Sequence, residues 1–166
     1  MVQIKIKRER IKFASDNVAG ACPEVLDAIL KANDGDRTPY GNDEISKSLQ
    51  DKFSDIFEKD VVVFPISSGT AANALALSTM TPSFGNIYCH KLSHINVDEC
   101  GAPEFYTGGA KLVTLNGVNG KITAEELDKS IVGKGIVHHT QPSSISITQL
   151  CETGEAYKLD EIKKIS

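Results

Sequence analysis

The sequence predicts an α/β fold in which helices flank a mainly parallel sheet. Two observations carry this prediction. Residues 61–66 form a continuous apolar run rich in β-branched side chains, which is typical of a strand covered on both faces. From that run to residue 166, strand patterns and helical patterns alternate along the chain, as they do in layered α/β proteins.

Composition limits the class of protein. The 166 residues, 40% hydrophobic and 24% charged, suit one ordinary globular domain. A net charge of −4 argues against a nucleic-acid partner, and the chain has no apolar run of about eighteen residues that would predict a membrane span. The four cysteines form no CxxC motif, and residues 1–13 look like an edge strand or solvated arm rather than a secretory signal. We therefore expect reduced thiols in a cytoplasmic protein.

Two amphipathic helices are expected before the apolar run. The first begins near Pro23, which suits a first helical turn, and has apolar residues at helical spacing over 25–30. The second has an apolar stripe over 45–57. Either Asn42 or Asp43 could cap it.

After the run, the pattern changes repeatedly between strand and helix. A helix over 71–77 follows the apolar run, and a capping box at 123–126 opens a later helix. The other expected elements are strands over 86–90, 110–115, 135–139 and 144–149, and helices over 96–105, 127–132 and 158–165.

The turn between the apolar run and the next helix has the chemistry of an anion site. Ser67, Ser68, Gly69 and Thr70 combine small side chains with hydroxyl groups. The first N–H groups of a helix lack internal partners and lie at the positive end of its dipole, so a phosphate can bind there. An ordinary βα turn with a serine cap is the alternative. The segment is neither GxGxxG nor a P-loop.

Histidines supply the next candidates. His94 follows the strand expected to end near His90, at the sheet edge where open α/β proteins bind ligands. Its imidazole could stack on a flat cofactor or carry a proton, although a surface loop histidine would look the same. His138 and His139 would alternate on a strand, so at most one would face a site. Asp98 and Glu99 are expected to be solvated helix residues, unless the loop that holds His94 lines a pocket. The chain lacks the GxSxG motif of a serine hydrolase and a convincing set of metal ligands.

An ordered set of motifs resembles the low-specificity threonine aldolases of the β-eliminating lyase group, which use pyridoxal 5'-phosphate (PLP). The motifs span nearly the whole chain, and their order is more specific than any one of them. They are FASDN at 13–17 with PEV at 23–25, YGND at 40–43, SGTAAN at 68–73, SHI at 93–95 with Glu99 and GA at 101–102, and QPS at 141–143 continuing through SITQ at 146–149 to Glu152 and Gly154.

The resemblance implies the aspartate aminotransferase-like fold (PLP fold type I) and a homo-oligomer with composite active sites. It implies a lyase that cleaves threonine or allo-threonine to glycine and acetaldehyde. It also implies the site residues. Ser68, Gly69 and Thr70 would hold the PLP phosphate, His94 would stack on the ring and assist proton transfer, Ser15 would lie near the substrate carboxylate, Tyr40 would line the site, and His138 or His139 would reach the substrate hydroxyl.

The same resemblance implies that the chain is the front part of a larger enzyme. Residues 1–40 would form an arm and the first helix, and 41–166 an incomplete PLP-binding large domain. The small C-terminal domain and the covalent lysine would lie beyond residue 166. We therefore expect little aldolase activity from this chain alone, unless a complementary chain supplies the missing residues. A non-catalytic remnant acting as a binding module and an unrelated α/β phosphate-binding protein are the alternatives.

Overall fold

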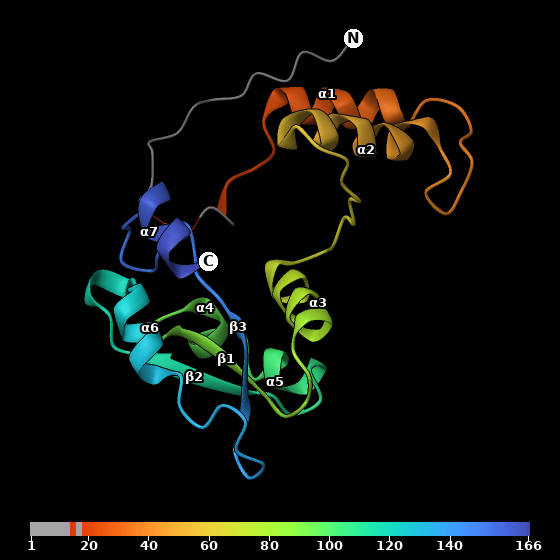
Figure 1. Ribbon diagram of the computed structural model, residues 1–166. Helices are drawn as coiled ribbons and strands as arrows, with labels where there is room; N and C mark the ends of the chain where they lie inside the picture. Colours follow the sequence, from red (N-terminus) through yellow and green to blue (C-terminus); the bar gives the residue numbers. More distant parts are fainter. Residues whose placement is uncertain (1–13, 16–17) are drawn as a thin grey trace. The chain divides into compact units, whose positions relative to one another are not determined.

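The computed structural model describes residues 14–15 and 18–166. The chain divides into two compact units, one ending at Val63 and the other comprising Phe64–Ser166. Figure 1 shows the elements of each unit. The arm expected over residues 1–13 lies outside the described residues, and the domain boundary expected near residue 40 stays a prediction.

The first unit contains the two expected helices. Helix α1 spans Pro23–Ala32 and has its proline in the first turn. Helix α2 spans Glu44–Phe57, and its cap is Asp43, whose side chain accepts a hydrogen bond from the backbone N–H of Ser46 at 2.8 Å. The Ser46 hydroxyl also donates to this carboxylate, and together these bonds lower the pKa of Asp43. Neither helix contains a buried residue.

The prediction of a strand over residues 61–66 is wrong. This segment has no strand assignment, and the side chain of Gln50 occupies the backbone groups that a neighbouring strand would use. Its amide nitrogen donates to the Val63 carbonyl at 3.3 Å, and its amide oxygen accepts from the Val63 N–H at 3.2 Å. The Val61 N–H donates to the Ser54 hydroxyl. A β-prone sequence needs ladder partners to form a strand, and α2 supplies side chains instead.

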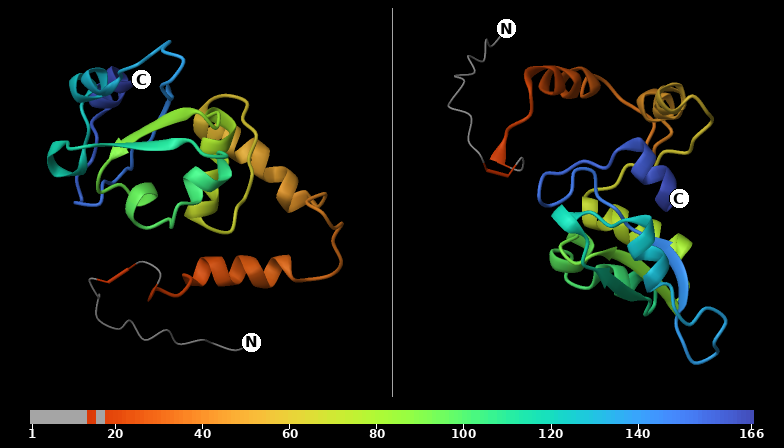
Figure 2. Two further views of the ribbon diagram at one scale, coloured as in Figure 1. Left: turned by 90° about the horizontal axis from the view of Figure 1, so that it is seen from below. Right: turned by 60° about the vertical axis from the view of Figure 1, so that its left-hand side comes forward.

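The second unit contains the predicted parallel sheet. Strand β1, Gly85–His90, lies between β2, Lys111–Leu115, and β3, Gln141–Ile145, and is parallel to both. Every residue of β1 is buried, as expected for a central parallel strand. Figure 2 shows the sheet from two further directions. The predicted α/β fold class is confirmed.

Helices cover both faces of this sheet (Figure 1). On one face lie α3, Gly69–Met80, α4, His94–Val97, and α5, Ala102–Tyr106. On the other lie α6, Ala124–Ser130, and α7, Leu159–Ile165, after a 3₁₀ turn at Val118–Gly120. Alternation along β1 supplies both cores. One core contains Leu77, Ile87, Cys89, Ile95 and Ala110, and the other contains Tyr88, Leu115, Ile122 and Leu127.

Most of the remaining elements match their predictions. The capping box of α6 is present, with Thr123 and Glu126 exchanging hydrogen bonds, and α7 lies where a helix was expected. The helix expected over 96–105 is instead two short helices. The backbone of Cys100 and Gly101 takes positive φ values of 51° and 74°, and this left-handed turn separates α4 from α5.

The prediction of a strand over residues 135–139 is also wrong. This segment is a loop that folds around the side chain of Gln141. The Gln141 amide accepts from the Gly135 N–H at 2.8 Å and donates to the carbonyls of Gly133, Ile136 and His139. The strand expected over 144–149 starts earlier and ends at Ile145. In the described part of the chain, no helix is long and apolar enough to cross a membrane.

Candidate functional site

The start of α3 presents unused hydrogen-bond donors. Ser68 is the cap, and its hydroxyl oxygen accepts from the Ala71 N–H at 3.2 Å. The Ser68 carbonyl accepts from the Ala72 N–H. Among the described residues, no hydrogen bond uses the N–H groups of Gly69 and Thr70. Two donors therefore remain at the positive end of a twelve-residue helix.

The space around these donors is open. A methyl group built at Gly69 would meet nothing within 4 Å. Ser68 and Thr70 line one end of a groove that continues over apolar side chains of α3 and α5, including Leu75 and Tyr106. An anionic group carried on a flat, partly apolar ligand could therefore reach these N–H groups without displacing protein atoms.

His94 is connected to α3 through a buried carboxylate. The Nδ1 atom of His94 lies 2.8 Å from Oε1 of Glu99. The same oxygen accepts a hydrogen bond from the Asn73 amide of α3 at 2.6 Å. The Glu99 side chain is fully buried, whereas that of His94 is 45% exposed. One oxygen therefore joins the helix that starts at Gly69 to an accessible imidazole.

The charges around His94 favour its protonated form. The hydrogen bond to Glu99 raises the pKa of His94, against a smaller opposing effect of burial. The carboxylates of Glu99, Glu152 and Asp98 raise this pKa further through space. His94 lies just after the carboxyl end of β1, where parallel sheets place their ligands.

The expectation that Glu99 is solvated is wrong. It is 3% exposed, and its Oε2 atom is buried without a hydrogen-bond partner in the described residues. Asn73 and His94 both bind its Oε1 atom, and the left-handed turn at Cys100 and Gly101 follows directly in the chain. Sequence reasoning therefore gave Glu99 and Asn73 no role in the site, although both lie in the motifs of the family resemblance. The glycine that interrupts the expected helix was the available signal.

The structure does not bring His138 to His94. The premise that His138 and His139 alternate on a strand is wrong, since both are exposed and belong to the loop before β3. Because β3 is parallel to β1, this loop lies at the amino edge of the sheet and His94 at the carboxyl edge. The His139 ring lies against Gly133, where a side chain would collide with it.

Ser15 and Tyr40 belong to the first unit. The Ser15 carbonyl accepts from the Val18 N–H at 3.1 Å. Tyr40 is 96% exposed and has a positive φ of 62°, followed by Gly41 at 72°. A left-handed conformation is costly for a tyrosine and is often associated with functional positions. The assignments of Ser15 and Tyr40 stay predictions.

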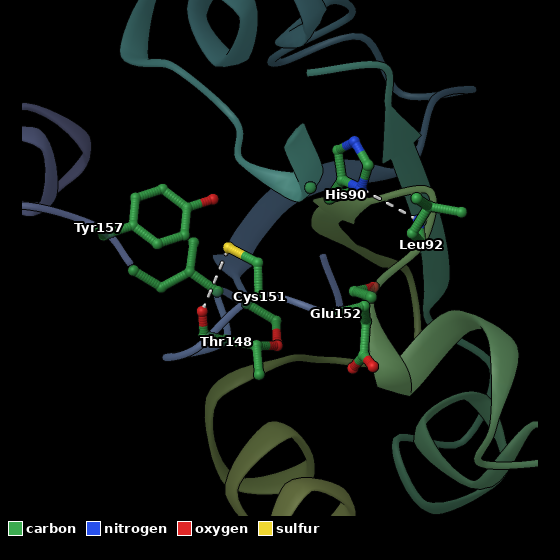
Figure 3. A pocket seen from close by; sticks show the side chains of 10 residues that line it. His90, Leu92, Thr148, Cys151, Glu152 and Tyr157 are labelled. Atoms are coloured by element: carbon green, nitrogen blue, oxygen red, sulfur yellow. Dashed lines mark hydrogen bonds between the residues drawn. The ribbon is translucent and has the colours of Figure 1, made fainter. Parts of the chain in front are cut away.

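A second, smaller cavity lies at the carboxyl edge of the sheet (Figure 3). His90, Cys151, Glu152 and Tyr157 are among the side chains that line it, and its volume of about 10 Å³ admits at most about one water molecule. Burial raises the pKa of the Cys151 thiol. The cavity is too small for a cofactor. The described residues contain no group of three or more metal-ligating side chains.

Comparisons with known proteins agree on one family. A family model described as beta-eliminating lyase matches residues 12–166. The chain is 41% identical over 155 residues to a protein of Pseudomonas sp. (strain NCIMB 10558) named low specificity L-threonine aldolase, covering 93% of this chain and 45% of the relative. A protein of the same name from Pseudomonas aeruginosa is 39% identical over 155 residues, which again cover 93% of this chain and 45% of the relative.

A solved structure gives the same result for the fold. The threonine aldolase of Leishmania major matches with a TM-score of 0.85 and 27% sequence identity, covering 92% of this chain and 44% of that one. The chain thus spans less than half the length of these relatives.

Proposed function

The chain belongs to the β-eliminating lyase family, and from this premise we propose that it provides the phosphate-binding and imidazole-bearing part of a PLP-dependent threonine aldolase. The proposed reaction is cleavage of threonine or allo-threonine to glycine and acetaldehyde. The observation that carries the proposal is the link between the two site elements. The helix with free N–H groups at its start also holds Asn73, which shares the Glu99 oxygen with His94.

The donor set fits PLP. The N–H groups of Gly69 and Thr70, with the hydroxyls of Ser68 and Thr70, offer hydrogen bonds to phosphate oxygens. No side chain at Gly69 obstructs the approach. The accessible His94 ring offers a flat surface to the cofactor ring. When bound, PLP supplies an electron-withdrawing ring that accepts the electron pair of the broken Cα–Cβ bond.

The residues of this chain would perform some of the remaining tasks. His94 would take the proton of the substrate β-hydroxyl, directly or through a water molecule. Ser15 would bind near the substrate carboxylate. The exposed Tyr40 would complete the site within a homo-oligomer. His138 is left out of this proposed site because it lies at the opposite edge of the sheet. We also propose a cytoplasmic location, as for an enzyme of amino-acid metabolism.

Phosphate recognition gives the direct test. PLP and pyridoxal, which lacks the phosphate, are titrated into the 166-residue chain while amide resonances of α3 are followed by NMR. We expect PLP to bind at least tenfold more tightly than pyridoxal, and Thr70→Ala to reduce this preference. Thr79→Ala is the matched control, because its hydroxyl binds the Ala76 carbonyl within the same helix.

Two results would contradict the proposal. Equal affinity for PLP and pyridoxal would show that the chain does not recognise the phosphate group. Binding of inorganic phosphate as tight as that of PLP would favour a general phosphate-binding module. Threonine cleavage is then assayed with PLP present. We expect no turnover from the 166-residue chain alone, because none of its lysines occupies a motif that matches the family.

A further inference from the structure

The hydrogen bonds around Glu99 determine which nitrogen of His94 carries a proton. The Asn73 amide donates to Oε1 of Glu99, so this oxygen is an acceptor. An ionised carboxylate oxygen can only accept, so a second partner at the same oxygen must also be a donor. The Nδ1 atom of His94 at 2.8 Å therefore carries a hydrogen.

The other ring nitrogen of His94 is consequently the basic one. Among the described residues, no hydrogen bond uses Nε2 of His94, and the side chain is 45% exposed. In the neutral ring Nε2 holds a lone pair. When it takes up a proton, Nδ1–H remains bound to Glu99, and the new positive charge faces a buried carboxyl group.

In His90, four positions earlier, the two ring nitrogens have the opposite hydrogen-bonding roles. Its Nδ1 atom accepts from the Leu92 N–H at 3.1 Å, and its Nε2 atom lies 2.9 Å from the Gly117 carbonyl oxygen. A carbonyl only accepts and a backbone N–H only donates. The hydrogen of His90 therefore lies on Nε2, and the ring is buried. The two rings provide an internal comparison.

We propose that Glu99 is the positioning residue of His94 and that Asn73 holds Glu99 in place. Together they fix the Nδ1–H tautomer of His94 and direct Nε2 outward as a proton acceptor. The use made of this nitrogen rests on the proposed function, whereas the tautomer itself does not. Free histidine in water prefers the Nε2–H tautomer, so the arrangement opposes the intrinsic preference of the ring.

Imidazole nitrogen shifts measure the tautomer directly. Long-range ¹H–¹⁵N correlation spectra of the labelled 166-residue chain, recorded without PLP, separate Nδ1–H from Nε2–H rings. At a pH where both rings are neutral, we expect the Nδ1–H pattern for His94 and the Nε2–H pattern for His90. An Nε2–H pattern at His94 would overturn the inference before any variant is made.

Variants then test the cause. Removing the carboxylate charge in Glu99→Gln should lower the pKa of His94, whose other charged neighbours are Asp98 and Glu152. Glu99→Leu should return His94 towards the Nε2–H pattern. Glu104→Gln is the matched control, since this glutamate also has a buried Oε2 without a partner in the described residues but makes no contact with His94 that raises its pKa.

The outcomes remain distinct from those of the proposed function. An unchanged His94 pKa in Glu99→Gln would overturn the positioning role even if PLP binds. The Nδ1–H pattern with failed PLP binding would support the positioning and contradict the cofactor. If Glu99→Leu does not fold, the spectrum of the unaltered chain and the Glu99→Gln titration still decide.

Discussion

The helices of the first unit and the central strand of the second differ in how much they bury. Helices α1 and α2 contain no buried residue, although Leu30 and Ile56 are about as apolar as any core residue. Every residue of β1 is buried. Packing fixes β1 and the turns that follow it, so the imidazole network lies on the most constrained part of the chain. Stability measured on this chain should report mainly the second unit.

The largest expected effect tests this contrast directly. Ile87 is 0% exposed and Ile56 is 70% exposed. Ile87→Ala should lower the free energy of unfolding by about 2–5 kcal/mol through lost burial and the cavity left behind. Ile56→Ala should change it by less than about 0.5 kcal/mol. Urea unfolding followed by circular dichroism measures both, and similar losses would mean that α2 is packed as firmly as β1.

A smaller loss of stability is expected where a buried side chain accepts a hydrogen bond from a backbone N–H of the second unit. The buried Tyr157 hydroxyl oxygen accepts from the Ile122 N–H at 2.8 Å. Tyr157→Phe leaves this N–H without a partner and should cost about 1–3 kcal/mol. Tyr106→Phe, at a 64% exposed position, serves as the control. The same urea transition is measured, and an unshifted midpoint in Tyr157→Phe would show that water replaces the hydroxyl.

Capping should matter less, and only in the first unit. Asp43→Ala removes the side-chain acceptor at the start of α2 and should destabilise this helix by about 0.5–2 kcal/mol. Asp51→Ala, within the same helix, should have little effect. Thermal scans of far-ultraviolet circular dichroism compare the two variants. If Asp43→Ala moved the unfolding of the sheet as well, the two units would not unfold independently.

The weakest expected effect is a dependence on pH. The hydrogen bond to Glu99 raises the pKa of His94 in the folded chain. Its stabilisation is therefore complete below the unfolded-state pKa and is lost as the pH rises through the higher folded-state pKa. Because the side chain is 45% exposed, the loss should be small. Unfolding curves across this pH range should show the decline, and Glu99→Gln should reduce it.

Much of the fold follows from local sequence patterns. The proline before α1, the aspartate before α2 and the capping box of α6 each act within a few residues, so their helices could be predicted. The buried strand β1 was expected from the β-prone residues at its centre, Ile87 and Tyr88. The strand expected over 61–66 failed because its formation depends on a partner strand, and Gln50 binds the Val63 backbone instead.

In the candidate site, too, features set by neighbouring residues could be predicted and features set by distant residues could not. The N–H groups before α3 could be predicted because capping chemistry is local. The burial of Glu99 could not, since its partner Asn73 lies 26 positions earlier in the chain. The strand over 135–139 was predicted wrongly because alternation presumes ladder partners, and the Gln141 side chain holds that segment as a loop.

The shared oxygen of Glu99 has a thermodynamic consequence. Asn73 and His94 draw on the same acceptor, so a change in one bond alters the free energy of the other. If an anion bound at the start of α3 shifts Asn73, anion binding and the protonation of His94 are linked through this oxygen. Linkage is reciprocal. Whatever factor the anion imposes on the proton affinity of the imidazole, protonation must impose on the affinity for the anion.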